Sequence, residues 1–188
     1  MEDTKTSYFC HWNSPLGGIT MASDGTYLTG LWFDGQKHFG STLSPDSSET
    51  VLNIFHTTIL WLEKYFQGEC PPESVPIRMI GTDYQKSVWR ALLEIPYGST
   101  VTYGELAKSL EITSGRRTSA RAAGNAVGRN PVSILIPCHR VIGAGGSLTG
   151  YAAGTDRKQA LLRLERTKCA ICPWCRPSFP WASTSPRV

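Results

Sequence analysis

The hydrophobic pattern of the first 81 residues predicts a few short strands followed by one helix. Three apolar segments have the length of strands: 8–12, 18–22 and 28–33. Asp24-Gly25, between the last two, predicts a tight hairpin turn. Apolar residues then recur near helical spacing and predict a helix from about Glu49 to Phe66: Leu52, Phe55, Ile59 and Leu62. Gly68 and Pro71-Pro72 end this pattern, because glycine caps helices and proline cannot continue one.

The pattern after residue 81 is mostly helical. Two capping-box sequences, Thr82 to Gln85 and Thr102 to Glu105, mark the first turns of two helices, and the first of these is expected to end before Pro96. Two further helices are predicted: 119–127, made of small residues, and 156–166. A helix, a polar turn and a second helix form the layout of a helix-turn-helix. Proteins that never contact DNA use the same layout, so a purely structural role stays open.

These elements predict an α/β N-terminal module, a small antiparallel sheet plus a helix, followed by a mostly helical C-terminal module that contains the helix-turn-helix. The N-terminal module and its linker cover 1–81, and the helical module covers 82–166. Residues 167–188 are rich in proline and have no acidic residue, so they are expected to form a disordered tail. Hydrophobic residues make up 40% of the chain, which is enough for a packed core.

Neither a membrane span nor a secretory signal is visible in the sequence. No apolar run reaches the roughly 18–20 residues that cross a bilayer. The first five residues lack the basic start and the apolar stretch of a signal peptide. We therefore expect a cytoplasmic protein, associated with the nucleoid or, in a eukaryote, located in the nucleus.

Charge is distributed unevenly along the chain, which has a net charge of +4. Residues 1–82 have 4 basic and 9 acidic side chains, whereas residues 83–166 have 12 basic and 6 acidic ones. The basic half is suited to a polyanion such as nucleic acid. Charge alone leaves open the alternative of an ordinary solvated surface.

The six cysteines are spaced too irregularly for a disulfide framework in a chain without a secretory signal. Cys138 stands beside His139 and Arg140, which supply a proton acceptor and a positive charge, and both favour the reactive thiolate. The alternative for such a pair is a buried cysteine next to a surface histidine. Neighbouring side chains in extended backbone point in opposite directions, so a relay between Cys138 and His139 needs a turn or a bridging water.

A long ordered signature surrounds Cys138. Asn130-Pro131 precedes a short apolar stretch, which is followed by Pro137-Cys138-His139-Arg140-Val141-Ile142, a glycine loop, and Gly150-Tyr151-Ala152-Ala153-Gly154. This signature closely resembles the active-site segment of the O6-alkylguanine-DNA alkyltransferases, also called methylated-DNA–protein-cysteine methyltransferases. The resemblance is strong over residues 83–166 and looser over the N-terminal module.

The resemblance implies catalytic roles for five residues. Cys138 resembles the alkyl acceptor, His139 the base that acts through a water, and Glu165 the carboxylate that orients His139. Asn130 is similar to the hinge asparagine that braces the loop between the DNA-binding helix and the active site. Tyr103 resembles the tyrosine that pushes the target nucleotide out and donates a hydrogen bond to the leaving guanine. Without the resemblance, Glu165 is a solvated helix residue and Tyr103 a packing residue.

The resemblance also implies a DNA-binding helix, which this family inserts into the minor groove, and a substrate pocket. Arg121 resembles the finger residue that fills the space left by the flipped nucleotide, and its alternative is one of several solvated arginines. Three residues complete the expected DNA contacts together with Tyr103: Ser119, Ala122 and Arg129. Tyr151 resembles the aromatic wall on which the flipped base stacks. Three further residues are expected at this pocket: Val141, Ala152 and Lys158.

The implied function is direct reversal of DNA damage. The thiolate of Cys138 displaces O6 of guanine from the alkyl carbon in double-stranded DNA, after the nucleotide has flipped out of the stack. The thioether product is not hydrolysed by water, so each molecule acts once, and the displacement requires no cofactor. O4-alkylthymine is a second candidate lesion. The protein is expected to work as a monomer and away from membranes.

Two departures accompany the resemblance. Ala153 stands where the family often has glycine, which adds a methyl group near the pocket. Some members hold a zinc ion in the N-terminal module through cysteine and histidine ligands, and this chain does not reproduce that arrangement: Cys10, His11, His38 and His56. The tail offers three cysteines without an evident fourth ligand, so no metal site is expected there either: Cys169, Cys172 and Cys175.

Three other functions compete with this interpretation. A relative that grips damaged DNA without repairing it would lack the acceptor cysteine, and Cys138 is present. A transcription regulator would need an effector or dimerisation segment, which the sequence does not supply. A cysteine hydrolase would need an oxyanion site and would turn over many times.

Overall fold

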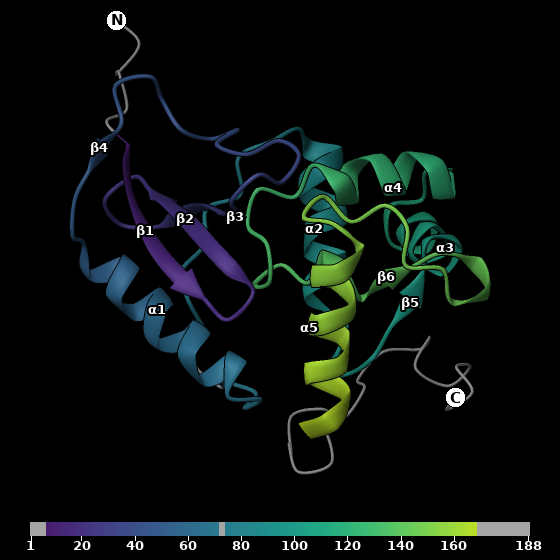
Figure 1. Ribbon diagram of the computed structural model, residues 1–188. Helices are drawn as coiled ribbons and strands as arrows, with labels where there is room; N and C mark the ends of the chain where they lie inside the picture. Colours follow the sequence, from purple (N-terminus) through teal and green to yellow (C-terminus); the bar gives the residue numbers. More distant parts are fainter. Residues whose placement is uncertain (1–6, 72–73, 169–188) are drawn as a thin grey trace, which may run out of the picture.

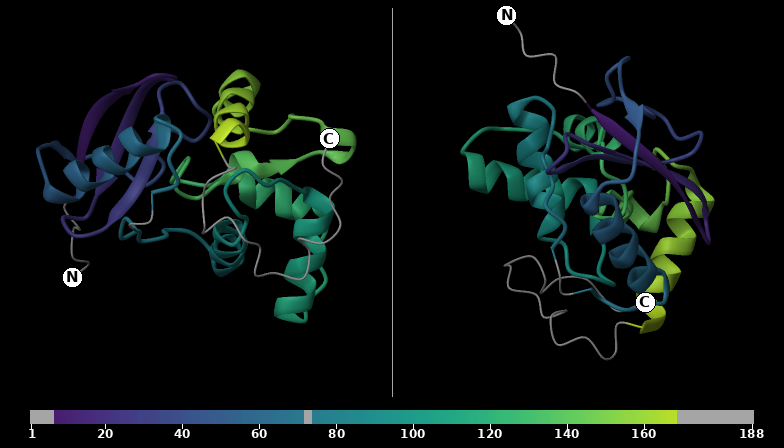
Figure 2. Two further views of the ribbon diagram at one scale, coloured as in Figure 1. Left: turned by 90° about the horizontal axis from the view of Figure 1, so that it is seen from below. Right: turned by 90° about the vertical axis from the view of Figure 1, so that its left-hand side faces the viewer.

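The computed structural model describes residues 7–71 and 74–168, which form a sheet-containing N-terminal part and a helical C-terminal part (Figure 1). The sheet has four strands in the order β3-β2-β1-β4: β1 (Tyr8–Ser14), β2 (Gly17–Ser23), β3 (Leu28–Phe33) and β4 (Ser48–Glu49). The first three are antiparallel neighbours, whereas β4 runs parallel to β1. Helix α1 (Asn53–Phe66) crosses one face of the sheet (Figure 2) and buries Phe55, Leu62 and Tyr65. The predicted fold class is confirmed.

Helix α1 begins four residues after the predicted start at Glu49. Ser48 and Glu49 form β4 instead, and the N–H of Thr50 donates to the carbonyl of Phe9 (3.1 Å). Leu52, the residue before the helix, still has extended backbone (φ −118°, ψ 150°). The prediction is wrong over 49–52 because backbone pairing with β1 competes with the helix there, and periodicity alone does not report this pairing.

The helical part contains four helices: α2 (Asp83–Leu93), α3 (Tyr103–Ser114), α4 (Ala120–Gly128) and α5 (Thr155–Lys168). Both predicted capping boxes are present, at Thr82 and at Thr102. Gly115 ends α3 in the left-handed region (φ 66°), which glycine enters without a steric penalty. The chain then turns into α4, where the hydroxyl of Ser119 accepts a hydrogen bond from the N–H of Ala122 (3.1 Å). Helices α3 and α4 therefore form the predicted helix-turn-helix.

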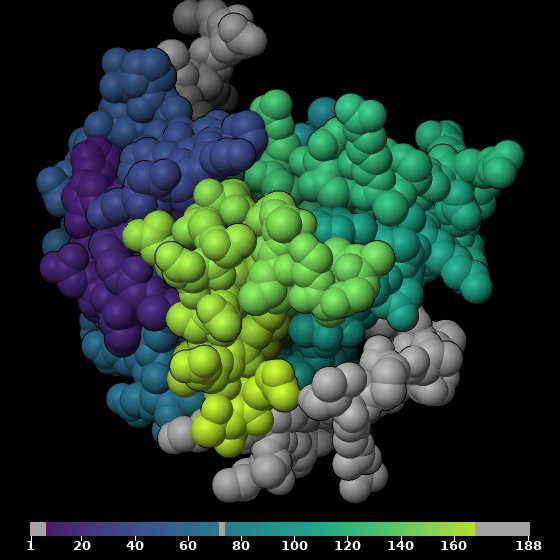
Figure 3. Space-filling model, turned by 45° about the vertical axis from the view of Figure 1, so that its right-hand side comes forward, coloured from purple at the N-terminus to yellow at the C-terminus, as the bar shows by residue number. Residues whose placement is uncertain are grey.

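Short elements link α4 to α5 along the chain. The single-turn helices η1 (Cys138–Arg140) and η2 (Ala144–Gly146) lie on either side of β6 (Val141–Ile142) along the chain. Strand β6 pairs in parallel with β5 (Val101–Thr102). In the space-filling view, the light-green and yellow segment from β6 through α5 lies between the N-terminal part and the teal helices (Figure 3).

The segment that leads into Cys138 is fixed to the edge of β3. The N–H of Leu31 donates to the carbonyl of Pro131 (2.8 Å), and the N–H of Ser133 donates to the carbonyl of Leu31 (2.8 Å). The buried side chain of Gln36 accepts a hydrogen bond from the Ser133 hydroxyl (3.1 Å). The short apolar stretch 132–136 therefore belongs to a core shared by both parts, and the N-terminal sheet supports the loop that carries the cysteine.

Within the described ranges, 7–71 and 74–168, no helix is long and apolar enough to cross a membrane. The same residues include no group of three or more His, Cys, Asp or Glu side chains placed to hold a metal ion. Cys169, Cys172 and Cys175 lie outside the described residues, as does nearly all of the predicted tail.

Candidate active site around Cys138

Cys138 begins the turn η1 and is almost completely buried (5% exposed). Its N–H donates to the carbonyl of Ile136 (2.7 Å). The side-chain amide of Asn130 donates to the Cys138 sulfur (3.0 Å), to the Ile136 carbonyl (2.8 Å) and to the Val132 carbonyl (3.2 Å). The Asn130 oxygen accepts from the N–H of Val132 (3.0 Å). This one buried amide thus holds both the reactive sulfur and the loop before it.

The environment of Cys138 keeps its sulfur protonated at neutral pH. Burial raises the pKa of the thiol to about 11, although the hydrogen bond from Asn130 and the charge of Lys158 oppose this rise. A thiol of this kind needs a proton acceptor at hand before it can act as a nucleophile.

His139 is the nearest candidate for that acceptor. The turn η1 supplies the change of chain direction that a relay between adjacent side chains requires. The imidazole is completely buried, and burial lowers its pKa, against the opposing influence of Glu165. A neutral ring donates its Nε2 proton to Glu165 Oε1 (2.8 Å). Nδ1 is then left as a lone-pair acceptor, and it has no hydrogen-bond partner among the described residues.

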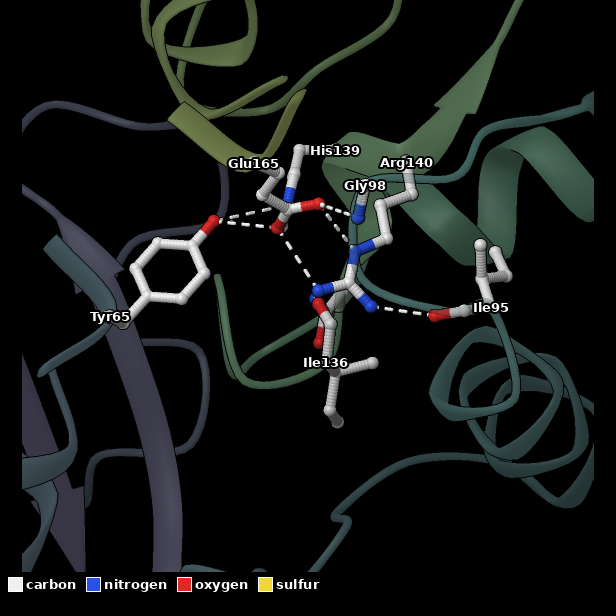
Figure 4. Close-up of polar contacts among 8 residues, drawn as sticks. Tyr65, Ile95, Gly98, Ile136, His139, Arg140 and Glu165 are labelled. Carbon is white, nitrogen blue, oxygen red and sulfur yellow. Dashed lines mark hydrogen bonds and ion pairs between the residues drawn. The ribbon is translucent and has the colours of Figure 1, made fainter. Parts of the chain in front are cut away.

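Glu165 is held as a carboxylate by four donor residues from three segments of the chain: α1, the loop before β5, and η1 (Figure 4). Arg140 donates to both oxygens, from Nε to Oε2 (2.9 Å) and from Nη2 to Oε1 (3.0 Å). The N–H of Gly98 donates to Oε2 (3.1 Å), and the hydroxyl of Tyr65 donates to Oε1 (2.7 Å). Burial on its own raises the pKa of Glu165, but His139 and Arg140 outweigh it and hold the pKa well below the usual range.

A hollow of about 1030 Å³ adjoins this centre and is lined by both parts of the chain. Tyr151 lies between the hollow and the buried centre, because it lines the hollow and its ring meets the His139 ring edge-on (centroids 6.4 Å apart). Helix α4 contributes Arg121, and the residue that directly follows this helix is Arg129; both are exposed. The N-terminal part contributes Lys37 and His38. Cationic side chains thus border the hollow from two directions.

Tyr103, the first residue of α3, lines the hollow beside Gly150. Its hydroxyl donates to the carbonyl of Thr149 (3.5 Å). Burial raises the pKa of Tyr103, and a thiolate at Cys138 would raise it further, so the phenol stays a proton donor. Gly150 has a φ of 89°, and a Cβ built on it would lie 2.9 Å from the Tyr103 oxygen. Glycine at 150 therefore makes room for this tyrosine.

The structure brings most of the predicted site residues together in two groups, one buried around Cys138 and one that lines the hollow. Cys138, His139, Glu165 and Asn130 are all buried; Asn130 donates a hydrogen bond to Cys138, and the adjacent His139 is hydrogen-bonded to Glu165. The hollow is lined by five of the predicted residues: Tyr103, Arg121, Arg129, Tyr151 and Ala152. Four others are not among its lining residues: Ser119, Ala122, Val141 and Lys158. Ser119 and Ala122 form the N-terminal cap of α4.

Lys158 is buried and binds backbone carbonyls of the segment between β6 and α5, which includes residues that line the hollow. Its ammonium group donates to the carbonyls of Val141 (2.6 Å) and Thr149 (3.5 Å). Burial lowers the pKa of Lys158 to about 8, and the charge of Cys138 acts in the opposite direction. A lysine in this position fixes the loop between β6 and α5, and its charge favours the thiolate of Cys138.

Comparison with known proteins identifies the family. The family model for the 6-O-methylguanine DNA methyltransferase, DNA binding domain, matches residues 83–167. The model for the 6-O-methylguanine DNA methyltransferase, ribonuclease-like domain, matches residues 5–79. A methylated-DNA--protein-cysteine methyltransferase of Methanosarcina acetivorans is 46% identical over 84% of this chain and 97% of its own length. The chain belongs to the 6-O-methylguanine DNA methyltransferase family.

Other family members agree in sequence and in structure. A methylated-DNA--protein-cysteine methyltransferase of Haemophilus influenzae is 39% identical over 85% of this chain and 86% of its own length. The crystal structure of Mycobacterium tuberculosis OGT in complex with DNA matches with a TM-score of 0.76 at 41% identity. That match covers 86% of this chain and 94% of the other. The family fold therefore extends over both parts of the described chain.

Sequence reasoning missed several residues that contact the centre. Tyr65 reaches Glu165 from α1, exactly 100 positions earlier in the chain, and Gly98 reaches it from the loop before β5. Lys37 and His38 line the hollow from the N-terminal part. Only contacts between distant segments place these residues at the site, so their local sequence offers no signal for them. The sequence predicts only that Arg140 supplies a positive charge beside Cys138, and it does not predict the bidentate pairing of Arg140 with Glu165.

Proposed function

We propose that this protein repairs alkylated DNA by moving the alkyl group from O6 of guanine in a duplex to the sulfur of Cys138. The observation that carries the proposal is the buried Cys138 thiol, which lies next to a neutral His139 backed by the carboxylate of Glu165. The hollow beside this centre is bordered by Arg121 of α4 and by Arg129, which directly follows this helix. Membership of a family whose relatives are named methylated-DNA--protein-cysteine methyltransferases supports the same chemistry.

The first step is removal of the thiol proton. With a thiol pKa of about 11, forming the thiolate at pH 7 costs about 5 kcal/mol. In the proposal, the proton passes through a bridging water to Nδ1 of His139, which the protein leaves unpaired among its described residues. Glu165 stabilises the resulting imidazolium through its hydrogen bond with Nε2. The proton transfer therefore offsets much of that cost.

The second step is a direct displacement. The Cys138 thiolate attacks the alkyl carbon, the bond between that carbon and O6 of guanine breaks, and a carbon–sulfur bond forms. The electron pair leaves with guanine, which takes up a proton from water as it is released, and in the proposal the Tyr103 hydroxyl, which lines the hollow, donates a hydrogen bond to it. Because the thioether is not hydrolysed, the protein is consumed, one molecule per lesion.

Access to the alkyl carbon requires the nucleotide to leave the base stack. Unstacking costs a few kcal/mol, and phosphate contacts together with a wedging side chain offset it. Arg121, exposed on α4 at the edge of the hollow, is proposed as that wedge, and Arg129 as a phosphate contact. Tyr151 is proposed as the surface on which the flipped base stacks.

We further propose that the active form is a monomer and that it works in the cytoplasm. In this proposal, residues 1–81 support the site and residues 82–166 bind DNA.

The proposal is tested on the DNA product. A duplex with a single O6-methylguanine is incubated with the protein and digested to nucleosides, and the recovered guanine is quantified. The unmodified protein and a Cys10→Ser control, which removes a half-buried free cysteine on β1, are expected to restore guanine. Cys138→Ser is expected to restore none. Repair by Cys138→Ser would assign the chemistry to another residue and refute the proposal.

A further inference from the structure

We infer that Tyr65, contributed by α1 of the N-terminal part, is a positioning residue that holds Glu165 and His139 in the arrangement that alkyl transfer needs. The inference rests on the function proposed above and adds a role for the N-terminal part in the chemistry. Figure 4 shows the Tyr65 hydroxyl pointing at the Glu165 carboxylate from the side opposite Arg140.

The geometry of Tyr65 is that of a fixed hydrogen-bond donor. Its hydroxyl lies 2.7 Å from Glu165 Oε1 and 3.4 Å from Nε2 of His139. The side chain is completely buried. Its ring stacks on Trp61 (centroids 5.4 Å apart) and meets Tyr97 edge-on (6.0 Å). Burial and the nearby carboxylate raise the pKa of Tyr65 well above its usual value, so the phenol remains protonated and donates.

Oε1 of Glu165 is the acceptor atom that the Tyr65 hydroxyl, Nε2 of His139 and Nη2 of Arg140 share. Because His139 donates its Nε2 proton there, its Nδ1 is free to act as the base toward Cys138. The Tyr65 hydroxyl satisfies part of the charge on Oε1 and so limits how strongly the carboxylate attracts the imidazole proton. Tyr65 thereby sets both the orientation and the basicity of His139.

Removing this hydroxyl has a predictable electrostatic consequence. With one donor fewer, Glu165 becomes more basic and raises the pKa of His139, so more of the imidazole is protonated at a given pH and unable to act as base. The other charged or titratable groups around His139 stay in place: Glu165 and Lys158 on α5, Arg140 on η1, and Tyr151 beside the ring. The acid limb of the rate–pH profile should therefore move to higher pH.

A purely structural role for Tyr65 would give a different result. Thr58 provides the matched control, because it is also completely buried on α1 and also carries a hydroxyl. That hydroxyl donates to the carbonyl of Ile54 (2.7 Å) within the helix and does not contact the active site. Tyr65→Phe and Thr58→Val each delete one buried hydroxyl from the same helix, so both are expected to lower the unfolding temperature.

The experiment measures benzyl transfer from free O6-benzylguanine to the full chain as a function of pH, alongside thermal unfolding. Tyr65→Phe is expected to lower the rate constant at pH 7 by about tenfold and to shift the acid limb upward by about half a pH unit or more. Thr58→Val is expected to keep the parent rate and profile. A Tyr65→Phe profile that matches the parent would overturn the inference, as would equal changes in both variants.

A second replacement covers the case in which Tyr65→Phe fails to fold. Site-specific incorporation of 3,5-difluorotyrosine at position 65 keeps the shape and makes the phenol a stronger donor. The acid limb is then expected to shift downward, opposite to the effect of deletion, and an unshifted limb would count against the inference. The proposed function is judged separately: if the unmodified protein transfers no benzyl group, that proposal fails, whereas transfer that is insensitive to Tyr65 defeats only this inference.

Discussion

Replacing Asn130 with alanine removes the brace under the reactive loop. The side chain is 4% exposed and contacts three backbone groups and the Cys138 sulfur. The N–H of Val132 loses its side-chain acceptor, whereas the carbonyl of Ile136 keeps the N–H of Cys138 (2.7 Å). An orphaned buried N–H costs about 1–3 kcal/mol and each of the two lost bonds to carbonyls about 1 kcal/mol, so the free energy of unfolding should fall by about 3–5 kcal/mol.

The same substitution should also slow the chemistry. The Asn130 amide favours the thiolate over the thiol, so its loss raises the pKa of Cys138 further. A hydrogen bond to a charged atom contributes about 1.5–3 kcal/mol, which corresponds to a rate loss of at least about tenfold near neutral pH. The deficit should shrink as the pH rises toward the thiol pKa, because solution base then replaces the missing stabilisation.

Urea unfolding and single-turnover transfer from free O6-benzylguanine separate the two effects. Asn13→Ala is the control, because Asn13 is exposed on β1 and its loss should change the free energy of unfolding by less than about 0.5 kcal/mol. If the free energy of unfolding of Asn130→Ala matched that of Asn13→Ala, the structural role of Asn130 would be refuted. A normal transfer rate in a destabilised Asn130→Ala would refute the electrostatic role.

Three further predictions concern the carboxylate, the wedge and the glycine beside Tyr103. Glu165→Gln leaves Arg140 without its buried counter-charge and should lower the free energy of unfolding by about 3–5 kcal/mol in calorimetry. Because the pKa of Glu165 is depressed, its stabilising contribution is complete above about pH 5 and is lost on further acidification. A stability–pH curve for Glu165→Gln that kept this acid loss unchanged would contradict the assignment. Arg121→Ala should slow repair of duplex DNA far more than transfer from free O6-benzylguanine, and equal losses would place Arg121 in the pocket or the fold instead. Gly150→Ala should displace Tyr103 and slow repair. Gly145→Ala is the control, because Gly145 also has a positive φ but no atom lies within 4 Å of the added Cβ, and it should lose only about 1 kcal/mol of stability. Equal repair rates in the two variants would argue against the contact between residue 150 and Tyr103.

The elements that local sequence governs could be predicted from it. Thr82 and Thr102 begin their helices through capping boxes that involve only residues three positions away. Strand β3 has the predicted bounds, and the turn into it contains Asp24-Gly25 as expected. The start of α1 could not be predicted in this way, because β4 forms only when Ser48 and Glu49 meet β1, about 40 residues earlier in the chain.

The residues of the candidate active site also fall into some that local sequence predicts and some that it does not. Asn130, Cys138 and His139 lie within ten residues of one another, and their signature identified them. Glu165 was assigned only through the resemblance, yet α5 turns Lys158, Leu161 and Glu165 inward at helical spacing, so polar residues in the apolar stripe of a helix were an available signal. Tyr65 is an ordinary buried aromatic in the pattern of α1. Its contact with Glu165 depends on how the two parts pack, which the sequence pattern does not specify.

Irreversible transfer of one alkyl group to Cys138 can be followed by measuring the mass of the intact protein. The protein is mixed with a tenfold excess of duplex containing O6-methylguanine and followed by mass spectrometry until no further change occurs. We expect the mass to rise by one methyl group and then stay constant, with the methyl group on the peptide that contains Cys138. Continued loss of lesions beyond one per protein molecule, or a methyl group on any other residue, would contradict it.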